Sequence, residues 1–217
     1  MNSKYFELIC DKNLDYIEDL INYLNSNIEE IMEFFNLNDI KDKKKIVIWT
    51  DINEYIKHIE QYSEYEDYMC ADTYDGNINM LSLEEAHKTN EHANMKVNEL
   101  IQNVKHEFVH ICQQECEKES ISDDIAWFWE ALATNLGNPE QFSKIDISDI
   151  TIDQLNNFNK LDNAYPISFT LGKYMLENYT HDEILEYVKY PKKLEQDQYN
   201  ILSSAKEEYM INNTMSI

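Results

Sequence analysis

Arginine is absent from this 217-residue chain, so all 18 of its basic residues are lysines, against 42 aspartates and glutamates. The formal net charge is −24. Such an acidic surface repels a phosphate backbone, and a chain without guanidinium groups lacks the usual bidentate partner of phosphate and guanine. We therefore expect no nucleic-acid partner and no binding to anionic membranes.

Glycine and proline are also scarce, with three of each, which leaves little room for linkers or repeats. No apolar run approaches the roughly 20 residues of a membrane span, and the N-terminal segment does not read as a secretory signal. The four cysteines have no disulfide-framework spacing, which predicts reduced thiols and a cytoplasmic protein. A hydrophobic share of 43% is typical of a folded chain, and the length predicts one domain over residues 1–217.

Hydrophobic periodicity places strands before helices. Strands are predicted at 3–10, 46–50 and 77–81, a long amphipathic helix at 14–35, and a second helix, capped by Asp51, up to about residue 61. From about residue 84 the chain is predominantly helical, with breaks near 137–139, near 163–166 and before Pro191. This order predicts an α+β fold, with a small N-terminal sheet in residues 1–83 and a mainly helical half in 84–217.

Residues 106–110 read HEFVH, an HExxH pattern. On a helix, His106 and His110 lie about 40° apart around the axis, so both imidazoles can reach one metal ion. Glu107 lies about 60° from His110, where it can take a proton from water as a general base. The opposite face carries the apolar residues Val97, Leu100, Ile101, Val104, Phe108 and Ile111. The alternative is a surface helix with two incidental histidines.

A catalytic zinc ion usually has three protein ligands, and Glu130 is the candidate for the third. It lies twenty residues past His110 in the apolar segment WFWEALA, residues 127–133. A carboxylate in such surroundings costs several kcal/mol unless a cation compensates its charge, and a metal ion would do so. The alternative is a glutamate on a helix surface with aromatic neighbours.

Together, HExxH and the downstream W-x-x-E-(G/A)-x-A resemble the gluzincin zinc metallopeptidases, in particular the small peptidase MA-like domains related to aminopeptidase N and thermolysin. The resemblance implies a thermolysin-like zincin catalytic domain, with Zn2+ bound by His106, His110 and Glu130 and with Glu107 as the catalytic base. It also implies that residues 76–81 form the edge strand that pairs with an extended substrate. Ala131 stands where the family most often has glycine.

Residues 164–176 are similar to the segment in which the aminopeptidase N group opens a helix with an oxyanion-stabilising tyrosine. This likeness implies that Tyr165 is a second catalytic residue, and Pro166 suits the first turn of such a helix. The chain has fifteen tyrosines. A packing or surface role for Tyr165 therefore stays open.

Other candidates are set aside. Cys112 and Cys116 point away from the HExxH face and are expected to be buried or semi-exposed thiols. His87 and His92 lie in a polar segment and are expected to be solvated. Thr134 and Asn135 are both candidates to hydrogen-bond a zinc-binding histidine, and the sequence does not choose between them.

The prediction is a zinc-dependent peptidase that acts on peptides or proteins. Residues 76–79 lack the glutamate with which aminopeptidases hold a free amine, which slightly favours an endopeptidase. Without arginine there is no guanidinium clamp for a substrate carboxylate, so a carboxypeptidase is the least expected option. The acidic surface favours basic or neutral substrates. The rival hypotheses are an inactive zinc-binding interaction module of the same fold and an acidic interaction protein without metal.

Overall fold

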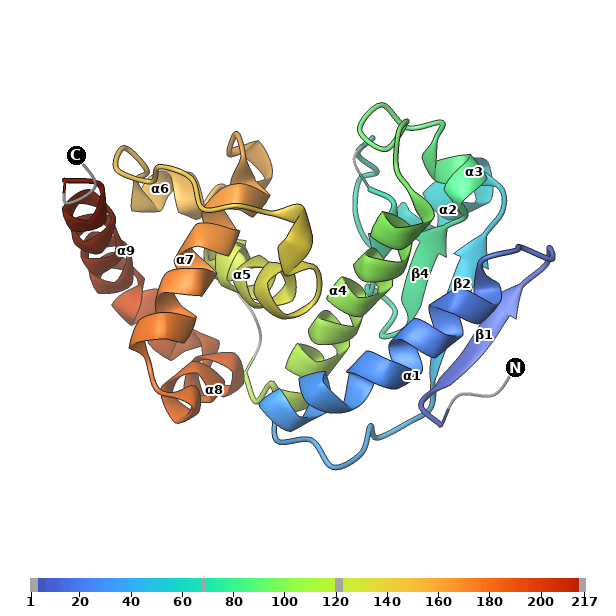
Figure 1. The fold of residues 1–217 in the computed structure, drawn as a ribbon, viewed down its shortest axis with the longest axis horizontal. Helices are drawn as coiled ribbons and strands as arrows, with labels where there is room; N and C mark the ends of the chain where they lie inside the picture. Colours follow the sequence, from blue (N-terminus) through green and yellow to red (C-terminus); the bar gives the residue numbers. More distant parts are fainter. Residues whose placement is uncertain (1–3, 68, 120–122, 215–217) are drawn as a thin grey trace. The chain divides into compact units, whose positions relative to one another are not determined.

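The computed structural model describes residues 4–67, 69–119 and 123–214 (Figure 1). The chain forms two compact units, residues 1–115 and residues 116–217. The first contains the described strands β1 (Phe6–Cys10), β2 (Lys44–Trp49), β3 (Ala71–Asp72) and β4 (Ile78–Leu81), with helices α1 (Ile17–Phe34), α2 (Ile52–Ile59), α3 (Leu83–Ala86) and α4 (Val97–Cys116). The second contains α5 (Ala126–Leu136), α6 (Ile152–Leu155), α7 (Ala164–Asn178), α8 (His181–Lys189) and α9 (Pro191–Thr214), with short 3-10 turns at 123–125, 139–141 and 158–160. The predicted α+β class, with its small N-terminal sheet and mainly helical remainder, is confirmed.

The sheet has the strand order β1-β2-β4-β3, in which β1, β2 and β4 are parallel and β3 is antiparallel to β4. Parallel neighbours need a crossover connection, and α1 supplies the one between β1 and β2. Ile46 of β2 is paired with Leu8 of β1 and with Ile78 of β4. These three side chains lie on the same face of the sheet as Phe6. The Phe6 ring meets the α4 ring of Phe108 at 5.4 Å between centroids, so α4 covers this face (Figure 1).

The strand predicted at 77–81 forms, but the edge position implied for residues 76–81 is wrong. β4 lies between β2 and β3, and all four of its residues are buried. The antiparallel strand β3, which the sequence did not reveal, pairs Ala71 with Met80 and Asp72 with Asn79. A substrate therefore could not pair along β4 at those positions, because β3 already takes its hydrogen bonds.

Local signals account for several element boundaries. Asp51 caps α2 as predicted, since its Oδ1 accepts a hydrogen bond of 2.8 Å from the Asn53 amide. Gly76 occupies a left-handed conformation with φ of 73° in the turn before β4. The helix that starts near residue 84 ends at Ala86, and residues 87–94 form turns, because this polar segment has no apolar stripe to pack.

The predicted division into a sheet-containing part up to residue 83 and a helical part from 84 differs from the boundary between the compact units. That boundary falls at 115/116, so nearly all of α4 belongs to the unit that holds the sheet. The physical reason is that α4 packs its apolar side on the sheet. Within the described part of the chain, no helix combines the length and the apolar character that crossing a membrane requires.

In the second unit, α5 and α7 approach closely at Gly172. A Cβ atom there would lie 2.6 Å from the Ala131 carbonyl oxygen and 2.5 Å from Asn135 Nδ2. Asn135 Nδ2 also donates to the carbonyl oxygens of Ala131 at 2.8 Å and Phe169 at 3.0 Å, which joins the two helices. This contact fixes the position of α5 and therefore of Glu130, one residue before Ala131.

We expect Gly172→Ala to lower the free energy of unfolding by about 2 kcal/mol, because overpacking against a rigid carbonyl outweighs the gain in helix propensity. Urea denaturation followed by circular dichroism measures the change. Lys173→Ala is the matched control, since Lys173 is the exposed next residue on α7. A Gly172→Ala variant as stable as Lys173→Ala would contradict the close approach.

Candidate metal centre

Helix α4 presents His106 and His110 on one face, as their spacing predicts. Their ring centroids lie 4.9 Å apart with the ring planes at 81°. His106 is 7% exposed and Glu107 is 8% exposed, so the motif lies largely out of water. The residues expected to anchor the other face are buried, namely Leu100, Ile101, Val104, Phe108 and Ile111, while Val97 is half-buried.

Helix α5 carries Glu130 in the apolar setting that the sequence predicted. Trp127, Phe128 and Trp129 before it are buried, whereas Glu130 is half-buried. His106 and His110 of the first unit and Glu130 of the second are the candidate ligands of one metal ion. Two imidazole nitrogens and one carboxylate oxygen fit a divalent transition metal ion, and this donor set is common for zinc without being specific to it.

Gln113 determines which nitrogen of His110 is available. Its Oε1 lies 2.8 Å from His110 Nδ1, and Gln113 itself is fully buried. An amide oxygen can only accept, so Nδ1 carries a proton, and in the neutral imidazole Nε2 then keeps its lone pair for a metal ion. Gln113 is thus the hydrogen-bond partner of a candidate ligand histidine. Its position three residues after His110, on the same side of the helix, is the pattern in the sequence that could have indicated this contact.

The two residues considered for that role make other contacts. The Thr134 hydroxyl donates to the Glu130 carbonyl oxygen at 2.7 Å and to that of Ala131 at 3.2 Å. Asn135 joins α5 to α7, as described above. Their described hydrogen bonds therefore stabilise the backbone around Glu130 and do not orient a histidine.

The segment 70–73, which contains β3, runs along α4 beside the HExxH motif. At one end Asn103 Nδ2 lies 3.8 Å from the Cys70 Sγ atom. At the other end Gln114 Nε2 donates to the Thr73 carbonyl oxygen at 3.4 Å and to its hydroxyl at 3.3 Å. Burial, with the nearby negative charge of Glu107, raises the pKa of the Cys70 thiol to about 12, which disfavours the nucleophilic thiolate.

Tyr165 lies in the first turn of α7, directly before Pro166, as predicted. Its ring stacks on Phe142 with centroids 6.5 Å apart and meets Phe158 edge-on at 5.6 Å. The side chain remains 36% exposed. These contacts place the tyrosine within the second unit, and its role as an oxyanion donor stays a prediction.

Two cysteines and one histidine that were not expected to bind the metal can be placed in the structure. Cys112 and Cys116 are buried free thiols, as expected. His87 is exposed, and its Nε2 lies 2.8 Å from the Met95 carbonyl oxygen. None of the three belongs to the group formed by His106, His110 and Glu130.

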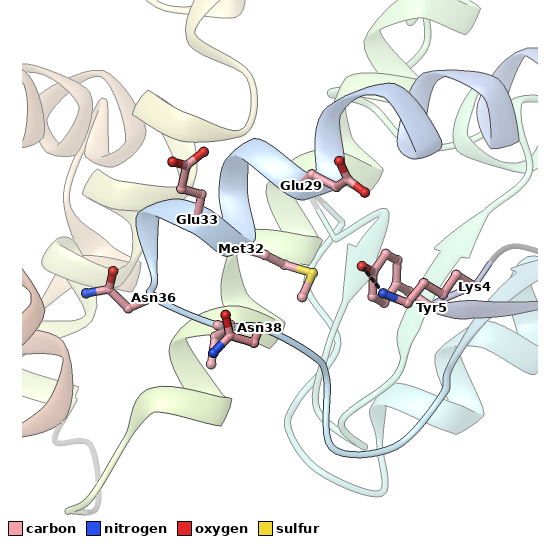
Figure 2. Close-up of a pocket in the computed structure, with 8 residues that line it drawn as sticks. Lys4, Tyr5, Glu29, Met32, Glu33, Asn36 and Asn38 are labelled. Carbon is pink, nitrogen blue, oxygen red and sulfur yellow. Dashed lines mark hydrogen bonds between the residues drawn. The ribbon is translucent and has the colours of Figure 1, made fainter.

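A pocket lies elsewhere in the first unit, at the end of α1 and the residues before β1 (Figure 2). It is lined by Lys4, Tyr5, Glu29, Met32, Glu33, Asn36, Leu37 and Asn38. Figure 2 shows the hydrogen bond of 2.7 Å from Lys4 Nζ to the Tyr5 hydroxyl beside it. Its lining includes no residue of α4, so it is separate from the HExxH motif.

Comparison with known proteins adds no identity: no protein-family model, no curated protein and no solved structure matches the chain. The chemistry of the side chains therefore carries the functional argument.

Proposed function

We propose that the protein is a zinc-dependent peptidase of the HExxH…E type, with a thermolysin-like zincin catalytic domain. The observation that carries the proposal is the pair of histidines on one face of α4, with ring centroids 4.9 Å apart, and Glu130 is proposed as the third ligand. Three protein ligands leave a coordination position open, as catalytic zinc sites do and closed structural sites do not. The Gln113 contact supports it further, because it selects the neutral tautomer of His110 in which Nε2 can bind a metal ion.

When bound, zinc would polarise a scissile carbonyl group and lower the pKa of water at the site. Glu107 takes the proton from that water on its carboxylate and returns it to the leaving amine. Glu107 suits this role because it neighbours His106 on α4 without being one of the three ligands. Tyr165 is proposed to donate its hydroxyl hydrogen bond to the developing oxyanion.

The glutamate within the motif favours a peptidase over an inactive zinc-binding module. A structural site needs its ligands but has no use for a carboxylate beside them. Here Glu107 is retained although it is 8% exposed, where a carboxylate is costly.

The test combines metal analysis with cleavage mapping. We expect about one zinc ion per chain from protein purified without added metal, and cleavage within the peptides of an unbiased library that a chelator abolishes and zinc restores. Metal content is measured by elemental mass spectrometry, and cleavage sites by mass spectrometry of the products.

Well under one equivalent of zinc in the purified protein, with no uptake on titration, would refute the metal site. Stoichiometric zinc without cleavage across the library would instead support the inactive interaction module. A His106→Ala, His110→Ala double variant is the reference for background metal.

A further inference from the structure

Two tyrosines that the proposed mechanism does not use form a stack on the surface of the first unit. The rings of Tyr62 and Tyr74 are nearly parallel, with centroids 6.1 Å apart and planes at 19°. Tyr62 is 50% exposed and Tyr74 is 48% exposed. We call this pair the aromatic stack. It offers solvent a pair of π-faces, which attract cations.

The stack is fixed from beneath by buried side chains. The Tyr62 ring contacts His58 at 5.4 Å, and His58 contacts the Trp49 ring at 5.3 Å. Asp72 Oδ1 lies 3.3 Å from His58 Nε2 and accepts a hydrogen bond of 3.1 Å from the Tyr74 amide. The Asp72 carboxylate therefore positions both tyrosines of the stack. Because the two rings are already held in place, ligand binding costs little further side-chain entropy.

The chain segments around the stack carry charge of one sign in sequence. Between Lys57 and Lys88 the chain has no lysine but eight aspartates and glutamates. Glu60 and Glu64 lie on either side of Tyr62 in sequence, and Asp75 follows Tyr74; all three are exposed. A cation over the rings would be attracted by both the π-faces and this acidic surface.

Within the first unit, the stack also lies near the HExxH motif of α4. Thr73, the residue before Tyr74, accepts hydrogen bonds from Gln114, which lies one helical turn past His110 on α4. Since His106, His110 and Gln114 are spaced four residues apart, they share one side of the helix. An extended chain lying over the motif could therefore reach the stack with a side chain.

We propose that the aromatic stack is a subsite for an arginine or lysine side chain of a peptide ligand. The subsite's role in substrate selection rests on the proposed peptidase function, whereas its binding of a cationic side chain does not. The guanidinium or ammonium group would lie on the outer ring face, with the acidic residues around it as counter-charges.

Binding is tested with zinc-loaded Glu107→Gln protein, so that the probe is not cleaved. The probe is a blocked heptapeptide of alanine and glycine with one central arginine, and its partner carries the neutral isostere citrulline. We expect the arginine peptide to bind about 3- to 10-fold more tightly, measured by nuclear magnetic resonance titration. Tyr74→Phe should keep this preference, and Tyr74→Leu should abolish it.

The Tyr74→Leu variant distinguishes binding to an aromatic ring face from binding to apolar surface area alone. Tyr199→Leu is the matched control, since Tyr199 is 69% exposed on α9 in the other unit. Equal affinity for the two peptides, or an unchanged preference in Tyr74→Leu, would overturn the inference.

Cleavage by the wild-type protein separates the two proposals. A binding preference in protein that cleaves neither these peptides nor any member of the library would support the subsite and refute the peptidase. Cleavage with equal kcat/KM for both peptides would leave the peptidase standing and refute the subsite.

Discussion

Replacing Glu107 by glutamine is expected to lower kcat for peptide hydrolysis by about 10³-fold, the scale of a lost general base. Glutamine has nearly the same size but cannot accept the proton from water at neutral pH. It also leaves His106, His110 and Glu130 in place, so zinc should remain at about one equivalent per chain. Turnover of a cleaved library peptide and metal content are measured on the same preparation.

Glu99→Gln is the control for the loss of one negative charge on the same helix. Glu99 lies in the first turn of α4, where its Oε2 accepts a hydrogen bond of 2.7 Å from the Lys96 amide, and glutamine can also accept that bond. We expect this variant to retain its activity. Similar activity in Glu107→Gln and wild type would remove Glu107 from the proposed mechanism.

Replacing Gln113 by leucine is expected to weaken zinc binding by roughly 10- to 100-fold. Leucine removes the acceptor of His110 Nδ1, so neither the tautomer nor the ring orientation is held for Nε2. Because the hydrogen bond is buried, no bulk water replaces it easily. Competition with a chromophoric chelator measures the affinity without reference to catalysis.

Gln113→Glu distinguishes positioning from packing, since it retains an acceptor oxygen and is expected to keep zinc affinity within a few-fold of wild type. Gln114→Ala is a second control, because Gln114 hydrogen-bonds to Thr73 and not to a histidine. Equal affinity in the leucine and glutamate variants would show that the contact does not orient His110.

Much of the fold could be predicted because it depends on local pattern. The long apolar stripe predicted α1, the β-branched run predicted β2, and Asp51 marked the start of α2. β3 was missed because two residues, Ala71 and Asp72, are too few for any periodicity. That strand depends on tertiary contacts, such as the hydrogen bond of 2.8 Å from the Leu81 amide to the Cys70 carbonyl oxygen.

The candidate site could be predicted to a similar extent. Helical geometry alone placed His106 and His110 on one face, and the apolar setting of Glu130 indicated a charge that needs a cation. The aromatic stack was not predicted, since Tyr62 and Tyr74 lie on either side of an irregular segment. Their contact depends on the buried Asp72, whose partner His58 lies fourteen residues before it in sequence.

The central place of β2 in the sheet has a consequence for synthesis on the ribosome. β2 can pair with β1 as soon as α1 has been made, but its other side pairs with β4, which emerges only with residues 78–81. Until then the backbone of Ile46, Val47 and Ile48 is an open apolar edge, the kind that promotes aggregation. The lysines at 43–45 lie directly before it and act as charged gatekeepers while the nascent chain is incomplete.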